Sequence, residues 1–148
     1  MAGRPTKYTS ELGDAICEAI AKSNRGLSTI CDLEGMPSRS TVHQWVIDNK
    51  EFSDKYARAR EDQADFLAEE MLTIADHSDK DTVIIYDKQG NPVPVEDKEW
   101  TNRSRLRVDT RKWIASKLKP KKYGDKIDVT TQGQAITQVT ITEKQRES

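Results

Sequence analysis

The stretch 27–45 constrains the fold most, because it predicts two short helices joined by a turn. Ile30 and Leu33 lie on one face of the first predicted helix. Gly35 follows, and glycine readily adopts the left-handed conformation that ends a helix. Ser38 is a good N-cap for the second helix. The apolar face of that second helix consists of Val42, Trp45 and Val46. The pattern is typical of a helix-turn-helix.

The outward face of the second helix is polar. It carries Arg39, Ser40, Thr41, His43 and Gln44. An arginine can bind a phosphate or a guanine edge, a glutamine can pair with adenine, and hydroxyls near a helix N-terminus suit phosphate. We therefore expect this face, with Ser38 at its start and Lys50 beyond it, to bind double-stranded DNA. The alternative is the solvated surface of a small helical bundle.

A short basic arm precedes the helices. Gly3-Arg4-Pro5 is followed by Lys7, and an extended Gly-Arg-Pro backbone can carry its arginine into a narrow minor groove. Arg4 and Lys7 are therefore candidate DNA contacts. The alternative is a tail that binds nothing.

The composition favours an elongated or oligomeric protein. Of 148 residues, 34% are hydrophobic and 33% charged, which is apolar-poor for a monomer with one large core. The formal net charge of −1 hides segregation, because 61–100 is acidic and 101–126 is basic. No stretch is long and apolar enough for a membrane span, and the polar N-terminus is unlike a secretory signal.

No enzymatic, cofactor or metal site is predicted. The chain has no Gly-x-x-x-x-Gly-Lys phosphate loop. Cys17 and Cys31 lie on or near apolar helix faces, which favours buried free thiols, and His43 and His77 do not complete a zinc site with them.

The centre of the chain predicts two long helices with a β-hairpin between them. The first helix spans about 51–76 and the second about 101–118, with strands at 82–86 and 92–95. The two helices can fold back on each other and also contact neighbouring subunits. The residues that we expect to mediate oligomerisation are Phe52, Tyr56, Leu67, Met71, Ile74, Leu106, Trp113 and Ile114.

The C-terminal part predicts two further strands, around Ile127 and Val129 and around Val139 and Ile141, with a turn at 130–134. An isolated two-stranded hairpin is marginal in water, so this one needs partners. A symmetric ring of such hairpins would close a barrel and remove its exposed edges.

Several motifs, taken in order, resemble those of the small subunit of tailed-phage terminases over about residues 3–126. They are Gly3-Arg4-Pro5-x-Lys7-Tyr8, Ile30-Cys31-x-x-Glu34-Gly35-Met36-Pro37-Ser38-x-x-Thr41-Val42-x-x-Trp45, Phe52-x-x-x-Tyr56-Ala57-x-Ala59-Arg60, Arg105-Leu106-x-Val108-Asp109-x-Arg111-Lys112-Trp113 and Pro120-Lys121-Lys122-Tyr123-Gly124.

The resemblance implies a mainly α fold in three modules with a tail. These are an N-terminal helix-turn-helix module at 1–50, a central helical oligomerisation module at 51–123 with the hairpin inserted at about 82–96, a β crown at 124–142 forming an intersubunit barrel, and a flexible tail at 143–148.

The resemblance also implies a function: the chain would be a non-catalytic subunit in the host cell cytoplasm. A ring would bind the packaging start site on viral DNA and deliver it to the large terminase subunit, which carries the ATPase and nuclease. Two alternatives stay open: a dimeric helix-turn-helix transcriptional regulator, and a scaffold that no longer binds DNA.

Overall fold

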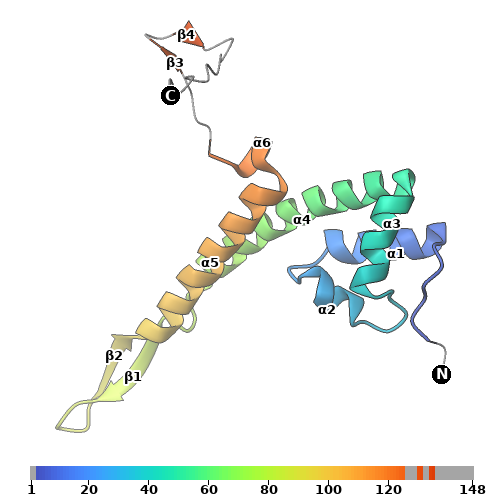
Figure 1. The fold of residues 1–148 in the computed structure, drawn as a ribbon. Helices are drawn as coiled ribbons and strands as arrows, with labels where there is room; N and C mark the ends of the chain where they lie inside the picture. The colour runs from blue at the N-terminus through green and yellow to red at the C-terminus, as the bar shows by residue number, and fades with distance from the viewer. Residues whose placement is uncertain (1–2, 126–129, 132–133, 136–148) are drawn as a thin grey trace, which may run out of the picture.

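The computed structural model describes residues 3–125, 130–131 and 134–135, and it is mainly helical as predicted (Figure 1). The elements in order are α1 (Ser10–Ala21), α2 (Leu27–Cys31), α3 (Arg39–Asp48), α4 (Lys50–Asp76), β1 (Thr82–Tyr86), β2 (Pro92–Glu96), α5 (Lys98–Leu118), α6 (Pro120–Tyr123), β3 (Thr130–Thr131) and β4 (Gln134–Ala135).

Helices α1 to α3 pack against the first half of α4 and form the N-terminal unit. Side-chain caps set where three of these helices begin: Thr9 accepts from the backbone of α1, Ser38 from that of α3, and Asn49 from that of α4. One apolar cluster joins them. Its fully or almost fully buried members include Ile16, Ile20, Ile30, Val42 and Phe52.

Helix α2 is shorter than predicted. It ends at Cys31, and the amide of Leu33 then donates to the carbonyl of Ile30 in a tighter turn. Leu33 is consequently 44% exposed, so its predicted place on the apolar face is wrong. Gly35 adopts a φ of 79°, which confirms the left-handed turn expected there.

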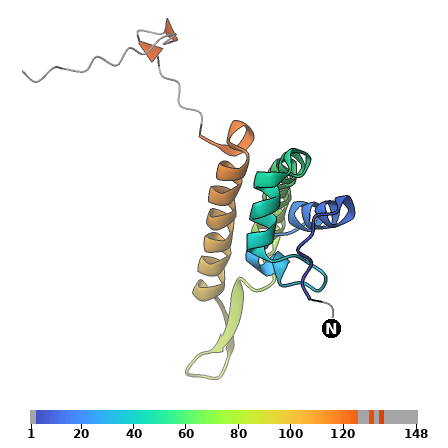
Figure 2. The same ribbon diagram turned by 45° about the vertical axis from the view of Figure 1, so that its right-hand side comes forward.

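Helix α5 folds back antiparallel on α4, as the two views show (Figures 1 and 2). Within this pair, Ala115 of α5 and Leu67 and Ile74 of α4 are buried, and Ala115 is 0% exposed. The large apolar residues Leu106 and Trp113 are instead 65% and 64% exposed. The face expected to be apolar on α5 is thus not the one that packs within the chain.

Polar contacts tie the N-terminal unit to the α4–α5 pair. The side chain of Gln63, only 3% exposed, donates to the carbonyls of Ser23 and Arg25 at 2.9 and 3.0 Å. Glu70 accepts from Asn24 at 2.6 Å and from Arg111 of α5 at 2.7 Å. Hydrogen bonds from Arg111 first, and then from Asn24, hold the pKa of Glu70 below its usual value despite its burial.

The short helix α6 closes against α4 through one carboxylate. Asp65 accepts from Lys119 and Lys122 at 2.8 Å each and from the hydroxyl of Tyr123 at 2.6 Å. These hydrogen bonds, that of Lys119 first, hold the pKa of Asp65 well below its usual value. Two lysines of the basic segment 101–126 therefore pair with a carboxylate of α4 in the same chain.

The hairpin β1–β2 confirms both predicted strands of the central insertion. Its turn uses Gly90 at a φ of 80°, where glycine avoids the steric penalty of other residues. At the C-terminus, β3 pairs antiparallel with β4 inside the segment for which the sequence predicts a turn. The strands expected around 127–129 and 139–141, most of the β crown and the tail at 143–148 lie outside the described residues.

Candidate nucleic-acid interface

The outward side of α3 carries four of the nine side chains predicted to contact DNA. Arg39, Ser40, His43 and Gln44 are exposed on it, whereas Thr41 is half-buried. The helix turns them outward because Val42 and Trp45 occupy the inner face, 0% and 5% exposed. One helix face therefore gathers four of the predicted contacts on a rigid element.

The hydroxyls of Ser38 and Thr41 at the start of α3 form hydrogen bonds within the chain. The Oγ of Ser38 accepts from the amide of Thr41 at 3.2 Å and lies 2.8 Å from the Thr41 hydroxyl. It also lies 2.9 Å from the Oγ of Ser40. Ser38 and Thr41 thus form the N-cap contacts of α3, and Ser40 is the exposed hydroxyl of this group.

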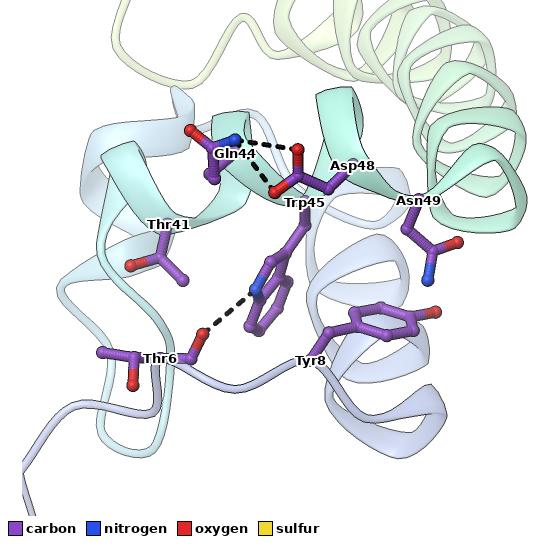
Figure 3. Close-up of a pocket in the computed structure, with 7 residues that line it drawn as sticks. All are labelled: Thr6, Tyr8, Thr41, Gln44, Trp45, Asp48 and Asn49. Atoms are coloured by element: carbon purple, nitrogen blue, oxygen red, sulfur yellow. Dashed lines mark hydrogen bonds between the residues drawn. The ribbon is translucent and has the colours of Figure 1, made fainter.

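The N-terminal arm is fixed beside α3 by aromatic contacts and one hydrogen bond. The indole of Trp45 donates to the carbonyl of Thr6 at 3.2 Å (Figure 3). The Tyr8 ring packs edge-on against Trp45 and Phe52, with centroids 5.3 and 5.6 Å apart. Burial raises the pKa of Tyr8. The arm and α3 border a hollow of about 420 Å³, whose lining includes the Gln44 side chain.

Carboxylates of the same chain hold several of the predicted contacts. Arg4 pairs with Asp32 at 3.2 Å, and Lys50 pairs with the carboxylate four residues later at 3.1 Å. The amide nitrogen of Gln44 lies 2.9 Å from both oxygens of Asp48 (Figure 3). Because a carboxylate only accepts, the Gln44 oxygen stays free in this contact, while the amide NH2 that bidentate adenine recognition needs as a donor is directed toward Asp48.

Arg39 and Lys7 differ from Arg4 and Lys50 because no carboxylate pairs with them among the described residues. Arg39 donates from Nε to the imidazole of His43 at 3.4 Å, four residues along the same helix. Among the described residues, neither Arg39 nor the exposed Lys7 forms an ion pair. These two cations are therefore the most available for phosphate.

Sequence reasoning missed the residues that organise this surface. Thr6 and Tyr8 dock the arm, and Asp32 and Asp48 pair with two side chains that were predicted to contact DNA, Arg4 and Gln44. The spacing of Gln44 and Asp48, four residues apart on one helix, is a signal for their hydrogen bond. The pairing of Trp45 with Thr6, far apart in sequence, has no local signal.

The structure separates the predicted oligomerisation residues into two groups. Phe52, Leu67 and Ile74 are core residues of the chain itself, 0%, 3% and 7% exposed, so their assignment to a contact with another subunit is corrected. Tyr56, Met71 and Ile114 are half-buried. Leu106 and Trp113 are exposed and remain available to a neighbouring subunit.

In the part of the chain that the structure describes, no three histidine, cysteine or acidic residues are grouped to hold a metal ion. Within the same residues, none of the helices combines the length and apolar character that crossing a membrane requires. Cys17 and Cys31 are both free. Burial raises the pKa of the Cys17 thiol to about 11, so this thiol is protonated and unreactive at neutral pH.

The chain matches known proteins along most of its length. The family described as Bacteriophage Sf6, terminase small subunit-like matches residues 8–130. Two crystal structures of the terminase small subunit gp1 of the bacterial virus Sf6 are similar, one of an arginine-to-alanine variant and one of a lysine-to-glutamate variant. They share 34% and 33% sequence identity with TM-scores of 0.63 and 0.64, and each alignment covers 95% of this chain and 97% of the other.

A comparison with curated proteins gave no match. With an N-terminal helical unit and a long helical pair, the fold is that of a packaging-related small subunit. The chain belongs to the Sf6 terminase small subunit-like family.

Proposed function

We propose that this chain is the non-catalytic DNA-recognition subunit of a viral genome-packaging terminase. In this proposal a ring of copies in the host cell cytoplasm binds the packaging initiation site. The ring then delivers the DNA to the large subunit, which carries the ATPase and nuclease. The observation that supports it most is the exposed polar face of α3 with the basic arm fixed beside it (Figure 3).

Phosphate binding by Arg39 and Lys7 is the testable core of this proposal. Each bound phosphate releases condensed counterions, so the affinity for DNA falls steeply with salt. Replacing Arg39 or Lys7 by alanine is expected to weaken binding and to reduce the salt slope by about one for each phosphate that is no longer neutralised. The measurement is fluorescence anisotropy of labelled duplex DNA over a series of salt concentrations.

Arg103→Ala provides a matched control. Its side chain is also an exposed arginine, 65% accessible, and it belongs to the first turns of α5, which directly follow β2. That end of α5 lies far from α3 (Figure 1). We expect this variant to bind DNA as the native chain does. Equal affinity and salt slope for the native chain, Arg39→Ala and Lys7→Ala would contradict the assigned contacts.

The ring is proposed from the surface of the α4–α5 pair. Leu72 on α4 and Leu106 and Trp113 on α5 are each about two thirds exposed. The outer faces of the two helices carry opposite charges, since the segment 61–100 is acidic and 101–126 basic. A head-to-tail contact between neighbours would cover these apolar residues and pair the charges.

Mass in solution separates this proposal from a dimeric regulator. Native mass spectrometry at micromolar concentration is expected to give more than two copies for the native chain. It is expected to give fewer for Trp113→Glu, which places a carboxylate in the proposed contact. A native monomer, or a native dimer on palindromic DNA, would contradict the ring.

A further inference from the structure

The β1–β2 hairpin exposes apolar side chains on both of its faces. Ile84, Ile85 and Tyr86 are 57%, 49% and 71% exposed. The hairpin projects from the far end of the α4–α5 pair, away from the N-terminal unit (Figures 1 and 2). A two-stranded hairpin is only marginally stable alone in water. An additional strand or a covering surface would stabilise it.

Hydrogen bonds at both ends of the hairpin determine which backbone groups point outward. The amide of Asp97 donates to the carbonyl of Asp81 at 2.7 Å, and that of Asp87 donates to the carbonyl of Asn91 at 3.0 Å. Bonded and non-bonded pairs alternate along an antiparallel ladder. The register therefore makes the odd-numbered residues of β1 bond to β2. The outward N–H and C=O groups of β1 belong to Thr82, Ile84 and Tyr86.

The outer edge of β2 is blocked to a further strand. Pro92 lies opposite Tyr86 and Pro94 opposite Ile84, so both prolines occupy positions whose backbone nitrogen faces outward. Proline has no N–H, and prolines on an edge strand prevent it from pairing. The outer edge of β1 retains its donors and acceptors. The hairpin thus has one edge open to another strand.

We propose that the open edge of β1 pairs antiparallel with β1 of a second copy of this chain, about a two-fold axis at Ile84. In this register Ile84 lies opposite Ile84 of the second copy, and Thr82 lies opposite Tyr86. All outward backbone groups of both strands then find partners. The apolar side chains of the two hairpins also become neighbours across the new ladder.

A second copy fits this edge better than an unlimited stack of strands. The joined sheet has the order β2–β1–β1–β2, so both of its outer edges carry Pro92 and Pro94. Growth therefore stops at two hairpins. The contact uses the same surface on both chains, as a two-fold contact requires, whereas a ring contact uses two different surfaces. The hairpins would join two separate rings end to end, leaving Leu106 and Trp113 free for the ring.

The charges that flank β1 give the contact a distinctive salt dependence. The proposed register places Asp81 across from Asp87 and Lys80 across from Lys88, and like charges across a ladder are destabilising. Salt screens exposed charges over about 10 Å at 0.1 M. Hairpin pairing is therefore expected to strengthen as salt rises, which is the opposite of phosphate binding.

Replacing Ile84 by proline tests the pairing directly. The substitution removes an outward N–H, as Pro94 does on the opposite strand, and leaves the bonds between β1 and β2 in place. Ile84→Val is the matched control, since it keeps both the N–H and a β-branched side chain. Native mass spectrometry at high salt is expected to show an even number of copies for the native chain and for Ile84→Val, and half that number for Ile84→Pro.

Hydrogen exchange measured on the native assembly tests the pairing without a substitution, so misfolding of a variant cannot affect the result. In a free hairpin the amides of Val83 and Ile85 are protected by β2, whereas that of Ile84 exchanges freely. Pairing protects Ile84 as well. Rapid exchange at Ile84 in the native chain, an odd copy number, or equal masses for native and Ile84→Pro chains would each overturn the proposal. None of these results depends on whether the chain binds DNA.

Discussion

Replacing Phe52 by alanine tests whether its aromatic ring stabilises the N-terminal unit or a contact between subunits. The side chain is fully buried, and its ring centroid lies 5.6, 5.7 and 6.1 Å from those of Tyr8, Trp45 and Tyr56. Removing a buried phenylalanine costs about 3–5 kcal/mol. We therefore expect the unfolding equilibrium of the N-terminal unit to shift roughly a thousandfold, which corresponds to about 4 kcal/mol.

Hydrogen exchange read by mass spectrometry measures this effect by segment. Amides of α1 and α3 are expected to exchange faster in Phe52→Ala, while those in the middle of α5 serve as an internal reference and the native mass is unchanged. Trp113→Ala is the converse control: its side chain is exposed, so α1 and α3 should exchange as before while the assembly weakens. Unchanged exchange in α1 and α3 together with a loss of mass in Phe52→Ala would refute the core assignment.

Three further substitutions each probe a different feature: the latch, by which we mean the hydrogen bonds from Lys119, Lys122 and Tyr123 to Asp65; the N-terminal arm; and helix α3. Because hydrogen bonds hold the pKa of Asp65 below its usual value, the latch stabilises the chain above the ordinary carboxyl pKa of about 3.9, and this stabilisation is lost as the pH falls below it. The thermal stability of Asp65→Asn should therefore lie below that of the native chain at pH 7, with the gap closing toward pH 3; a gap that does not depend on pH would count against the latch. In Gly13→Ala the new Cβ would lie 2.8 Å from the Tyr8 ring, so the arm should loosen, exchange faster and bind DNA less tightly; an arm that exchanges as in the native chain would show that Tyr8 does not fix it. Asp48→Ala removes a negative charge from the DNA side and frees the Gln44 amide, so DNA affinity should rise about fivefold, the effect of roughly 1 kcal/mol of relieved repulsion at close range in water; weaker binding would mean that Asp48 supports the interface rather than competing with it.

Helix boundaries could be predicted where a local capping signal exists. Ser38 before α3 sets a start that matches the prediction, and the hairpin turn at Gly90 follows from glycine's tolerance of positive φ. The end of α2 could not be predicted, because Asp32 to Glu34 carry no strong stop signal. A five-residue helix depends on tertiary packing more than on its own residues.

The packing face of α5 illustrates a different limit of prediction from sequence. Hydrophobic periodicity places Leu106 and Trp113 on one apolar face of α5, yet the residue of α5 that is buried within the chain is the small Ala115. A small residue and the bridge from Arg111 to Glu70 hold the helices together there. Leu106 and Trp113 therefore remain candidates for the contact between subunits that the sequence predicts, while the residue buried within the chain could not be predicted from apolar periodicity.

At the candidate DNA interface, the exposed residue types could be predicted but their hydrogen-bond partners could not. Helical spacing correctly placed Arg39, His43 and Gln44 on the outside of α3. The docking of the arm depends on Trp45 meeting Thr6, a contact between segments far apart in the chain. Such contacts arise only when the whole unit is assembled.

The hydrogen bonds from Gln63 and Glu70 fix the α1–α2 loop on α4, and α3 packs directly against α4, so these contacts oppose a free rotation of α3 relative to α4. A DNA-binding unit on a flexible linker could change its orientation to fit each DNA groove. In the proposed ring, the pitch and spacing of neighbouring α3 helices would be set by how the long helices are arranged. If this ring binds DNA as proposed, the duplex would have to bend to fit it, and sites that bend easily would be favoured over stiff ones even where no base is contacted.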